Sequence, residues 1–347
     1  MPQDYSKRLQ QLTSRYNPEN SRIVEERMIS DEYSYDADVA RYVKRAMCAV
    51  DDEYTRKTKE AGEMAKRHIS TAIRDVSFEY QGSVMTDTHI RGASDIDLLV
   101  FCEKFYGTDI DKVREEIQHP GNHTYSQLIR LIDYNNSFSL YQGNSSEDLR
   151  QLRASIEDVM LHNYSICDIS KAKAVKITNQ HLHRDVDVVT SSWFQSFNYI
   201  LNGKPKEMRG IKIFNKELGY AEGPDFPFLS ISRINERSAA TEGRLKKMIR
   251  FLKNVREDSG EGTGLTSFEI NAICYSIPPS EYAYLNYKEL VPILWTNMYH
   301  LWHDNKQDEL KSVVGDEFVF KGKPDKVDAL KKLEDEVFKI KNDLFNE

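Results

Sequence analysis

The sequence predicts an α+β protein in which a mixed β-sheet with helices is followed by a helical lobe. Strand-like alternation and helical spacing interleave up to about residue 189, whereas the chain from residue 234 onward is mostly helical in pattern. Its 347 residues are enough for two domains or one large bilobed unit. With 39% hydrophobic and 30% charged residues, the composition is that of a folded globular protein.

These patterns divide the chain into four parts. Residues 1–35 form a polar segment in which Pro18 interrupts any early helix. Residues 36–200 form the sheet-containing core with its leading helix. Residues 201–233 are rich in glycine and proline, so we expect a looped crossover there, followed by the helical lobe over residues 234–347.

Charge and composition exclude several classes of protein. A net charge of −7 argues against broad coating of nucleic acid, which depends on neutralising phosphates. The sequence has no long unbroken apolar run and no charged-then-apolar leader, so we expect neither a membrane span nor a secretory signal. The isolated cysteines predict free, buried thiols in a reducing cytosol, without a zinc site. They are Cys48, Cys102, Cys167 and Cys274.

The first candidate site follows a helical pattern over residues 36–75. Apolar and polar residues alternate over residues 76–80, which predicts a half-buried strand. This strand leads directly into Gln81, Gly82 and Ser83. Such a turn offers backbone N–H groups and a hydroxyl that suit phosphate oxygens, although an ordinary turn has the same composition.

Two acidic residues, Asp95 and Asp97, then lead an apolar run. Because alternate side chains of a strand face the same way, both carboxylates project from one face. Adjacent carboxylates repel each other unless a cation lies between them, and oxygen ligands of this kind suit Mg²⁺ together with substrate phosphates. An Asp-x-Asp pair alone is common, so the prediction depends on the order of Gly-Ser, loop, Asp-x-Asp and apolar strand.

A third carboxylate is expected from residues 183–189. Asp185 and Asp187 alternate with valines and therefore share one face of a predicted strand. Two-metal phosphoryl transfer generally uses a further carboxylate for the metal that activates the attacking hydroxyl. We choose Asp187, which has the more apolar continuation, and keep Asp185 in reserve. The alternative is a surface cluster in which one or both of these acids pair with Arg184, Lys176 or His183.

The helical lobe contains a cationic helix. Lys246, Arg250 and Lys253 fall at i, i+4 and i+7, so they line one flank beside an apolar stripe. A solvated basic face is the plain interpretation, and a clamp for a triphosphate is the functional one.

A break over residues 259–262 precedes the next predicted helix. Thr266 or Ser267 is positioned to cap that helix. A hydroxyl at such an N-terminus, beside free N–H groups, is also well placed to contact a phosphate.

Together these segments resemble the polymerase-β-like nucleotidyltransferase superfamily and, within it, the bacterial cGAS/DncV-like nucleotidyltransferases (CD-NTases). The QGS wording, the approach loop over residues 88–92 and the sequence Asn235-Glu236-Arg237 carry the narrower resemblance. It implies a bilobed fold in which a long N-terminal helix spans both lobes and the active site lies between them.

The resemblance also implies roles for individual residues. Two Mg²⁺ ions, or Mn²⁺ in their place, would be bound by the catalytic residues Asp95, Asp97 and Asp187. The nucleotide, including its triphosphate, would be contacted by Gln81, Gly82, Ser83, Lys253 and Ser267.

The implied activity is template-independent joining of NTPs, with release of pyrophosphate, into a cyclic di- or trinucleotide for antiphage (CBASS-type) signalling. ATP is expected among the substrates, the second base stays open, and a downstream effector that senses the cyclic nucleotide is the implied partner. The sequence has no match to the zinc insertion of the animal DNA sensor, so activation by DNA is not implied. Two alternatives remain: a nucleotidyltransferase that extends RNA ends or modifies proteins, and a nucleotide-binding module without turnover.

Overall fold

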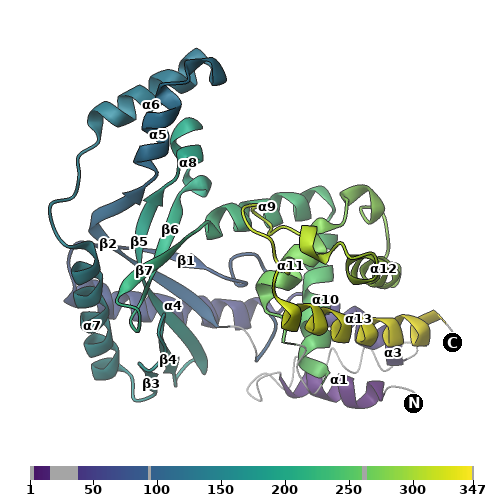
Figure 1. The fold of residues 1–347 in the computed structure, drawn as a ribbon. Coiled ribbons are helices and arrows are strands. Elements are labelled where there is room, and N and C mark those ends of the chain that lie inside the picture. Colours follow the sequence, from purple (N-terminus) through teal and green to yellow (C-terminus); the bar gives the residue numbers. More distant parts are fainter. Residues whose placement is uncertain (1–3, 16–37, 93–94, 260–263, 346–347) are drawn as a thin grey trace. The chain divides into compact units, whose positions relative to one another are not determined.

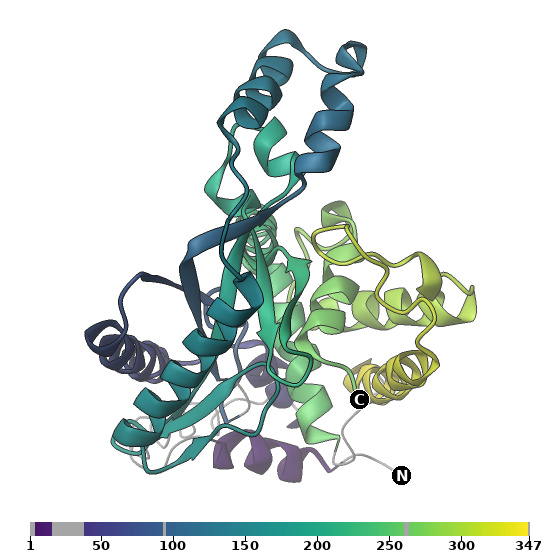
Figure 2. The same cartoon turned by 60° about the vertical axis from the view of Figure 1, so that its left-hand side comes forward.

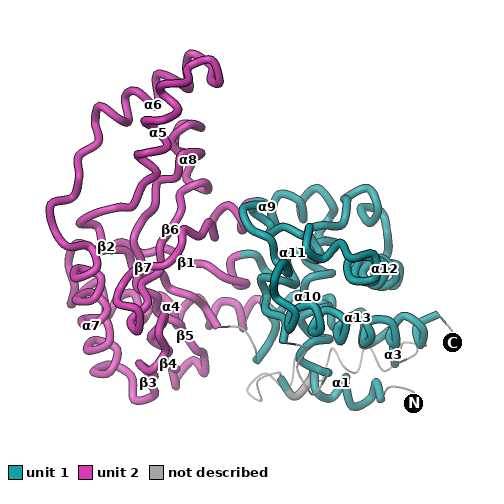
Figure 3. Tube along the Cα trace, in the orientation of Figure 1, with its two compact units in different colours: residues 1–51, 86–94, 233–347 teal, residues 52–85, 95–232 magenta. Residues whose placement is uncertain are grey.

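The computed structural model describes residues 4–15, 38–92, 95–259 and 264–345 (Figure 1). Most of the predicted polar segment and most of the predicted break over residues 259–262 lie outside the described residues. The chain divides into two compact units (Figure 3). The helical unit comprises residues 1–51, 86–94 and 233–347, and the sheet unit comprises residues 52–85 and 95–232.

The sheet unit contains a seven-stranded mixed sheet. Its main path has the order β1-β2-β5-β4-β3, while β6 pairs with β5 and β7 pairs with β6. The pairing of β2 with β5 is parallel, and the other pairs are antiparallel. The strands are β1 (Val76–Gln81), β2 (Ile96–Thr108), β3 (Cys167–Asp168), β4 (Val175–Asn179), β5 (Arg184–Gln195), β6 (Gly210–Asn215) and β7 (Tyr220–Asp225).

Alternation along the central strands gives the sheet two different faces. Ile96 and Leu98 of β2 and Val186 and Val188 of β5 are fully buried in one apolar core. Apolar side chains of two helices complete that core. These helices are α4 (Asp52–Ala72) and α7 (Ser145–Asn163). The intervening positions face the opposite way, which leaves the carboxylates of these strands outside the core.

A small helical group lies beyond one end of the strands (Figure 2). Val113, Leu131 and Phe197 contribute to its separate apolar cluster. Its helices are α5 (Ile110–Ile117), α6 (Tyr125–Ser137) and α8 (Phe197–Leu201). The connecting one-turn helices of this region are Pro120–Asn122 and Lys206–Met208.

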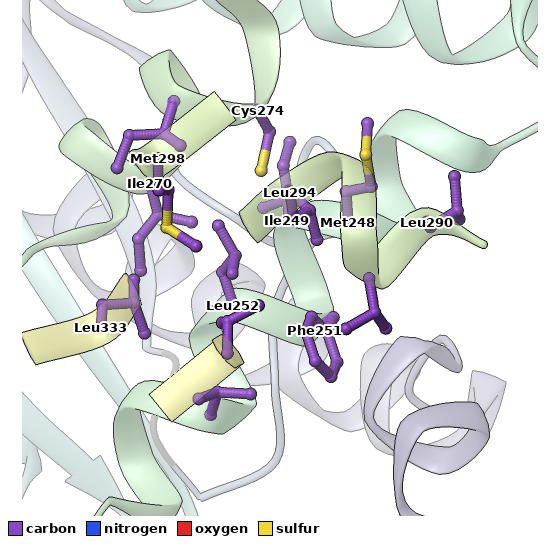
Figure 4. Packing of buried hydrophobic residues seen from close by; sticks show 14 of the residues in the cluster. Met248, Ile249, Phe251, Leu252, Ile270, Cys274, Leu290, Leu294, Met298 and Leu333 are labelled. Carbon is purple, nitrogen blue, oxygen red and sulfur yellow. The ribbon is translucent and has the colours of Figure 1, made fainter. Parts of the chain in front are cut away.

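The helical unit is organised around α10, whose apolar stripe is buried as predicted. Met248, Ile249, Phe251 and Leu252 are fully buried in a core that draws on the surrounding helices (Figure 4). The helix α10 spans Arg244–Asp258, and the surrounding helices are α1 (Tyr5–Ser14), α3 (Asp38–Met47), α9 (Pro227–Ala240), α11 (Ser267–Ser276), α12 (Leu290–His303) and α13 (Pro324–Phe345).

The structure differs from the sequence-based expectations at three places. The cysteines are free, but Cys48 is exposed and Cys167 half-buried, so only Cys102 and Cys274 are buried as expected. The helical pattern over residues 36–75 forms two helices, α3 and α4, rather than one, and α4 restarts with Asp52 and Glu53 in its first turn, where acidic side chains favour the helix dipole. The expected crossover loop over residues 201–233 contains β6, β7 and the start of α9. There Gly219, with φ of +74°, forms the turn of a hairpin rather than part of a linker. Among the described helices, none is long and apolar enough to cross a membrane.

Arg153 of α7 is expected to contribute strongly to the stability of the sheet unit. Its side chain is 2% exposed, and its Nη2 donates to the carbonyl oxygens of Lys171 and Ala174, each at 3.0 Å. Replacing it by Met would remove these part-buried hydrogen bonds and the ion pair of Arg153 with Glu157, so we expect Arg153→Met to lower the free energy of unfolding by about 2–4 kcal/mol. Chemical denaturation of wild type and variant measures this difference in the free energy of unfolding. Arg150→Met on the same helix is the control, because Arg150 has a side chain that is 68% exposed and should unfold like wild type.

Candidate functional site

A row of polar side chains crosses four strands of the sheet. In the strand pairing, Gln81 of β1 lies opposite Asp97 of β2, Asp97 lies opposite Asp187 of β5, and Asp187 lies opposite Lys176 of β4. Directly opposite residues of paired strands present their side chains on the same face. We call these four residues the cross-strand row. The structure therefore brings together Gln81 and two of the predicted acids, which lie far apart in the sequence.

Asp95 and Asp185 lie next to this row and share one lysine. Lys176 Nζ is 2.7 Å from Asp95 Oδ2 and 3.0 Å from Asp185 Oδ2. The hydroxyl of Thr178 donates to Asp185 Oδ1 at 2.6 Å. The pairing with Lys176 that the sequence left open is thus present for Asp185. Of the two acids on β5, Asp187 is the one opposite Asp97.

The electrostatics of the row reflect crowded negative charge. Burial, together with the nearby charges of Asp187 and Asp95, raises the pKa of Asp97 to about 7. Burial also raises the pKa of Asp187, although Lys171, whose Nζ is 3.4 Å from Asp187 Oδ1, lowers it in part. The described acids are therefore under-compensated by positive charge.

No group of three or more His, Cys, Asp or Glu side chains within the described ranges is gathered closely enough to hold a metal ion. Two of the predicted acids contact lysines instead. Asp95 is bound to Lys176, and Asp187 is paired with Lys171. Convergence of the acids on a cation requires these contacts to loosen.

Gly82 brings the QGS turn against the row. Its φ of +87° lies in the left-handed region that favours glycine. A Cβ at this position would collide with the carboxylate of Asp97. The N–H of Met85 donates to the carbonyl oxygen of Gly82 at 3.2 Å, which closes the turn. The turn therefore requires glycine both for its backbone conformation and for its approach to Asp97.

The cationic flank of α10 is not a solvated face. Lys253 is 1% exposed and its Nζ donates to the carbonyl oxygen of Thr88 at 2.9 Å. Arg250 donates to the carbonyl oxygens of Met47 at 2.9 Å and Asp87 at 2.6 Å. The plain interpretation of a solvated flank is therefore wrong for these two residues. Burial, followed by the charge of Arg256, lowers the pKa of Lys253 to about 7.

Thr266, rather than Ser267, caps α11. Its Oγ1 accepts a hydrogen bond from the N–H of Phe268 at 3.2 Å, and Glu269 accepts from the N–H of Thr266 at 2.6 Å, so that a capping box forms. Ser267 is thereby left half-buried in the first turn of the helix. Lys253 and Ser267 belong to the helical unit, whereas Gln81, Gly82, Ser83 and the acids belong to the sheet unit.

Sequence reasoning missed Lys171 and Thr178, and it named Lys176 only as a surface partner. A strand was predictable here, because polar and apolar residues alternate over residues 175–178. The sequence contains no signal for the register of that strand, which decides which acids the lysine reaches.

Comparison with known proteins places these features in a family. Residues 232–341 match the family model for the cGAS/DncV-like nucleotidyltransferase C-terminal helical domain. The chain is 65% identical over 341 residues to a c-di-GMP synthase of Lachnospiraceae bacterium (strain RUG226). The aligned region covers 98% of this chain and 99% of that protein.

Two solved structures are similar to this one along their whole length. A STING-associated CdnE c-di-GMP synthase from Flavobacteriaceae sp. has a TM-score of 0.86 at 32% identity, covering 100% of this chain and 99% of that chain. A STING-associated CdnE c-di-GMP synthase from Capnocytophaga granulosa has a TM-score of 0.80 at 40% identity, covering 99% of each chain.

These similarities confirm the predicted fold, a polymerase-β-like nucleotidyltransferase core with a helical domain, and the predicted enzyme class, a nucleotidyltransferase that forms a cyclic nucleotide. The chain belongs to the cGAS/DncV-like nucleotidyltransferase (CD-NTase) family.

Proposed function

We propose that this protein makes c-di-GMP from two molecules of GTP, with release of two molecules of pyrophosphate. The observation that carries this proposal is the 65% identity, over nearly the full length of both chains, to a c-di-GMP synthase. Because guanine is the only base in this product, GTP takes the place of the ATP that the sequence favoured.

We further propose Asp95, Asp97 and Asp187 as the ligands of two divalent cations. The residues fit such ions because their donors are carboxylate oxygens, which Mg²⁺ and Mn²⁺ prefer. The register that sets Asp97 opposite Asp187 supports this proposal, since burial and the neighbouring carboxylates raise the pKa of Asp97 and a cation would offset that repulsion. When bound, the ions would neutralise charge on the phosphates and activate the attacking ribose hydroxyl.

The remaining proposed site residues act on the nucleotide. Gln81, Gly82 and Ser83 would orient the donor phosphates through the turn next to Asp97. Lys253 and Ser267 would contact the triphosphate. An anion beside Lys253 favours its charged form, so a lysine with a pKa near 7 gains a proton as phosphate binds. Holding the donor in line with a ribose hydroxyl is the main contribution of these side chains to catalysis.

For the product, we propose a downstream effector that binds c-di-GMP in antiphage signalling. Two structurally similar proteins are STING-associated c-di-GMP synthases, which supports a STING-type effector for this protein.

Incubation of the purified protein with Mg²⁺ and each NTP is the direct test of the product. We expect GTP alone to be converted into c-di-GMP and pyrophosphate, and ATP, CTP or UTP alone to give no cyclic product. Liquid chromatography with mass spectrometry identifies the product, and an Asp187→Asn preparation controls for contaminating activity. Linear products only, or a cyclic product that contains another base, would refute the assignment.

Asp97→Asn is expected to abolish synthesis while making the metal-free protein more stable above acidic pH. The pKa of Asp97 is raised from 3.8 to about 7, so between these values the native chain retains a proton that the unfolded chain has lost. Wild-type stability therefore falls as pH rises through this window. We expect the variant to match wild type near pH 4 and to exceed it on the order of 1–2 kcal/mol at pH 8.

Urea denaturation in EDTA across this pH range measures the difference between the two proteins. An advantage of the variant that does not depend on pH, or a variant that is less stable at pH 8, would contradict the electrostatic account.

Gly82→Ala is expected to reduce synthesis by more than about tenfold, because its methyl group displaces the QGS turn or the carboxylate of Asp97. Gly219→Ala is the matched control. It also has a positive φ, of +74°, but no heavy atom lies within 4 Å of the added Cβ. Both variants should lose about 1 kcal/mol of stability from backbone strain. Initial rates of pyrophosphate release distinguish the two variants. Equal rates would show that the close approach of residue 82 to Asp97 is unimportant for synthesis.

A further inference from the structure

We propose that Lys176 is an internal counter-cation that competes with the divalent metal for Asp95, and that Asp185 anchors Lys176 instead of binding metal. This inference rests on the proposed function, since it concerns the proposed metal ligands. It assigns roles to Lys176, a member of the cross-strand row, and to Asp185 beside the row, two charged residues that the proposed chemistry leaves unused.

A continuous chain of contacts carries the inference. The Thr178 hydroxyl donates to Asp185 Oδ1 at 2.6 Å, Asp185 Oδ2 is 3.0 Å from Lys176 Nζ, and the same Nζ is 2.7 Å from Asp95 Oδ2. The pairing of β4 with β5 determines this series of contacts, because it places Thr178 opposite Asp185. Lys176 is therefore held from one side by Asp185 and presents its charge to Asp95 on the other.

Asp185 is already occupied at both oxygens, which distinguishes it from Asp187. One oxygen accepts from Thr178 and the other pairs with Lys176. Asp187 has a looser contact, with Lys171 at 3.4 Å, and lies opposite Asp97 in the parallel pair. A metal ion that binds Asp185 would have to displace both Thr178 and Lys176. A metal ion that binds Asp187 would have to displace only Lys171, which lies farther away.

The position of Lys176 has a consequence for metal binding. Without metal, its ammonium offsets the repulsion among the clustered carboxylates and occupies an oxygen of Asp95. When a divalent ion approaches, the same ammonium repels it and must release Asp95. Metal binding to the empty enzyme is thereby weakened, and the negative charge of a bound triphosphate strengthens it.

Binding of Mn²⁺ to the nucleotide-free protein tests the competition. By isothermal titration calorimetry, we expect Lys176→Met to bind Mn²⁺ about fivefold more tightly than wild type, because a unit charge near the ion has been removed. Lys176→Arg keeps the charge and should restore the wild-type affinity. Lys173→Met is the matched control: Lys173 is on the same segment, is 54% exposed and pairs with Glu222 rather than with a proposed ligand. Unchanged or weaker Mn²⁺ binding by Lys176→Met would overturn the inference.

A second pair of variants tests the role of Asp185. Asp185→Asn should retain saturable Mn²⁺ binding, and Asp187→Asn should lose it. Circular dichroism confirms that each variant is folded. If Asp185→Asn loses Mn²⁺ binding as completely as Asp187→Asn, Asp185 is a ligand and the inference is wrong. Failure of wild type to bind Mn²⁺ at all would instead refute the proposed metal site, and with it the inference.

Discussion

The parallel pairing of β2 with β5 is the constraint on which the chemistry of the sheet unit depends. Its register sets Asp97 opposite Asp187, and the neighbouring residues Ile96 and Val186 are fully buried on the other face. A slip of one residue in either strand would turn that strand's carboxylates into the apolar core and its valines or leucines outward. The packing of α4 and α7 against this core therefore fixes the positions of the acids, although neither helix contributes a proposed ligand.

Charge balance in the row explains several features that look unrelated in the sequence. Carboxylates from β2 and β5 lie close enough to raise the pKa of Asp97, and the lysines that offset them come from β4 and the segment before it. Because Gly82 has no side chain, the QGS turn can lie directly against the carboxylate of Asp97. The arrangement retains uncompensated negative charge in the absence of ligand, as expected for a site that binds cations and phosphates together.

Local patterns in the sequence were sufficient for two of the strands that contribute to the cross-strand row. The alternation over residues 76–80 corresponds to β1, and the alternation around Asp185 and Asp187 corresponds to β5. The contacts of Lys176 were not predictable, because they depend on which strand pairs with β5 and in which register, and neither is a local property. The hairpin of β6 and β7 was missed for another reason: its glycines and prolines are equally typical of a turn between strands and of a linker.

Lys253 illustrates how burial changes the meaning of a sequence pattern. Helical spacing assigned it correctly to a cationic flank, but that flank binds backbone carbonyls, and only the tertiary structure reveals this. A neutral donor would satisfy the carbonyl oxygen of Thr88 without the cost of withdrawing an ammonium group from water. The lysine, with its pKa lowered to about 7, is therefore poorly explained by a structural role alone. An anion beside Lys253 would favour its charged form, in keeping with the proposed contact between Lys253 and the triphosphate.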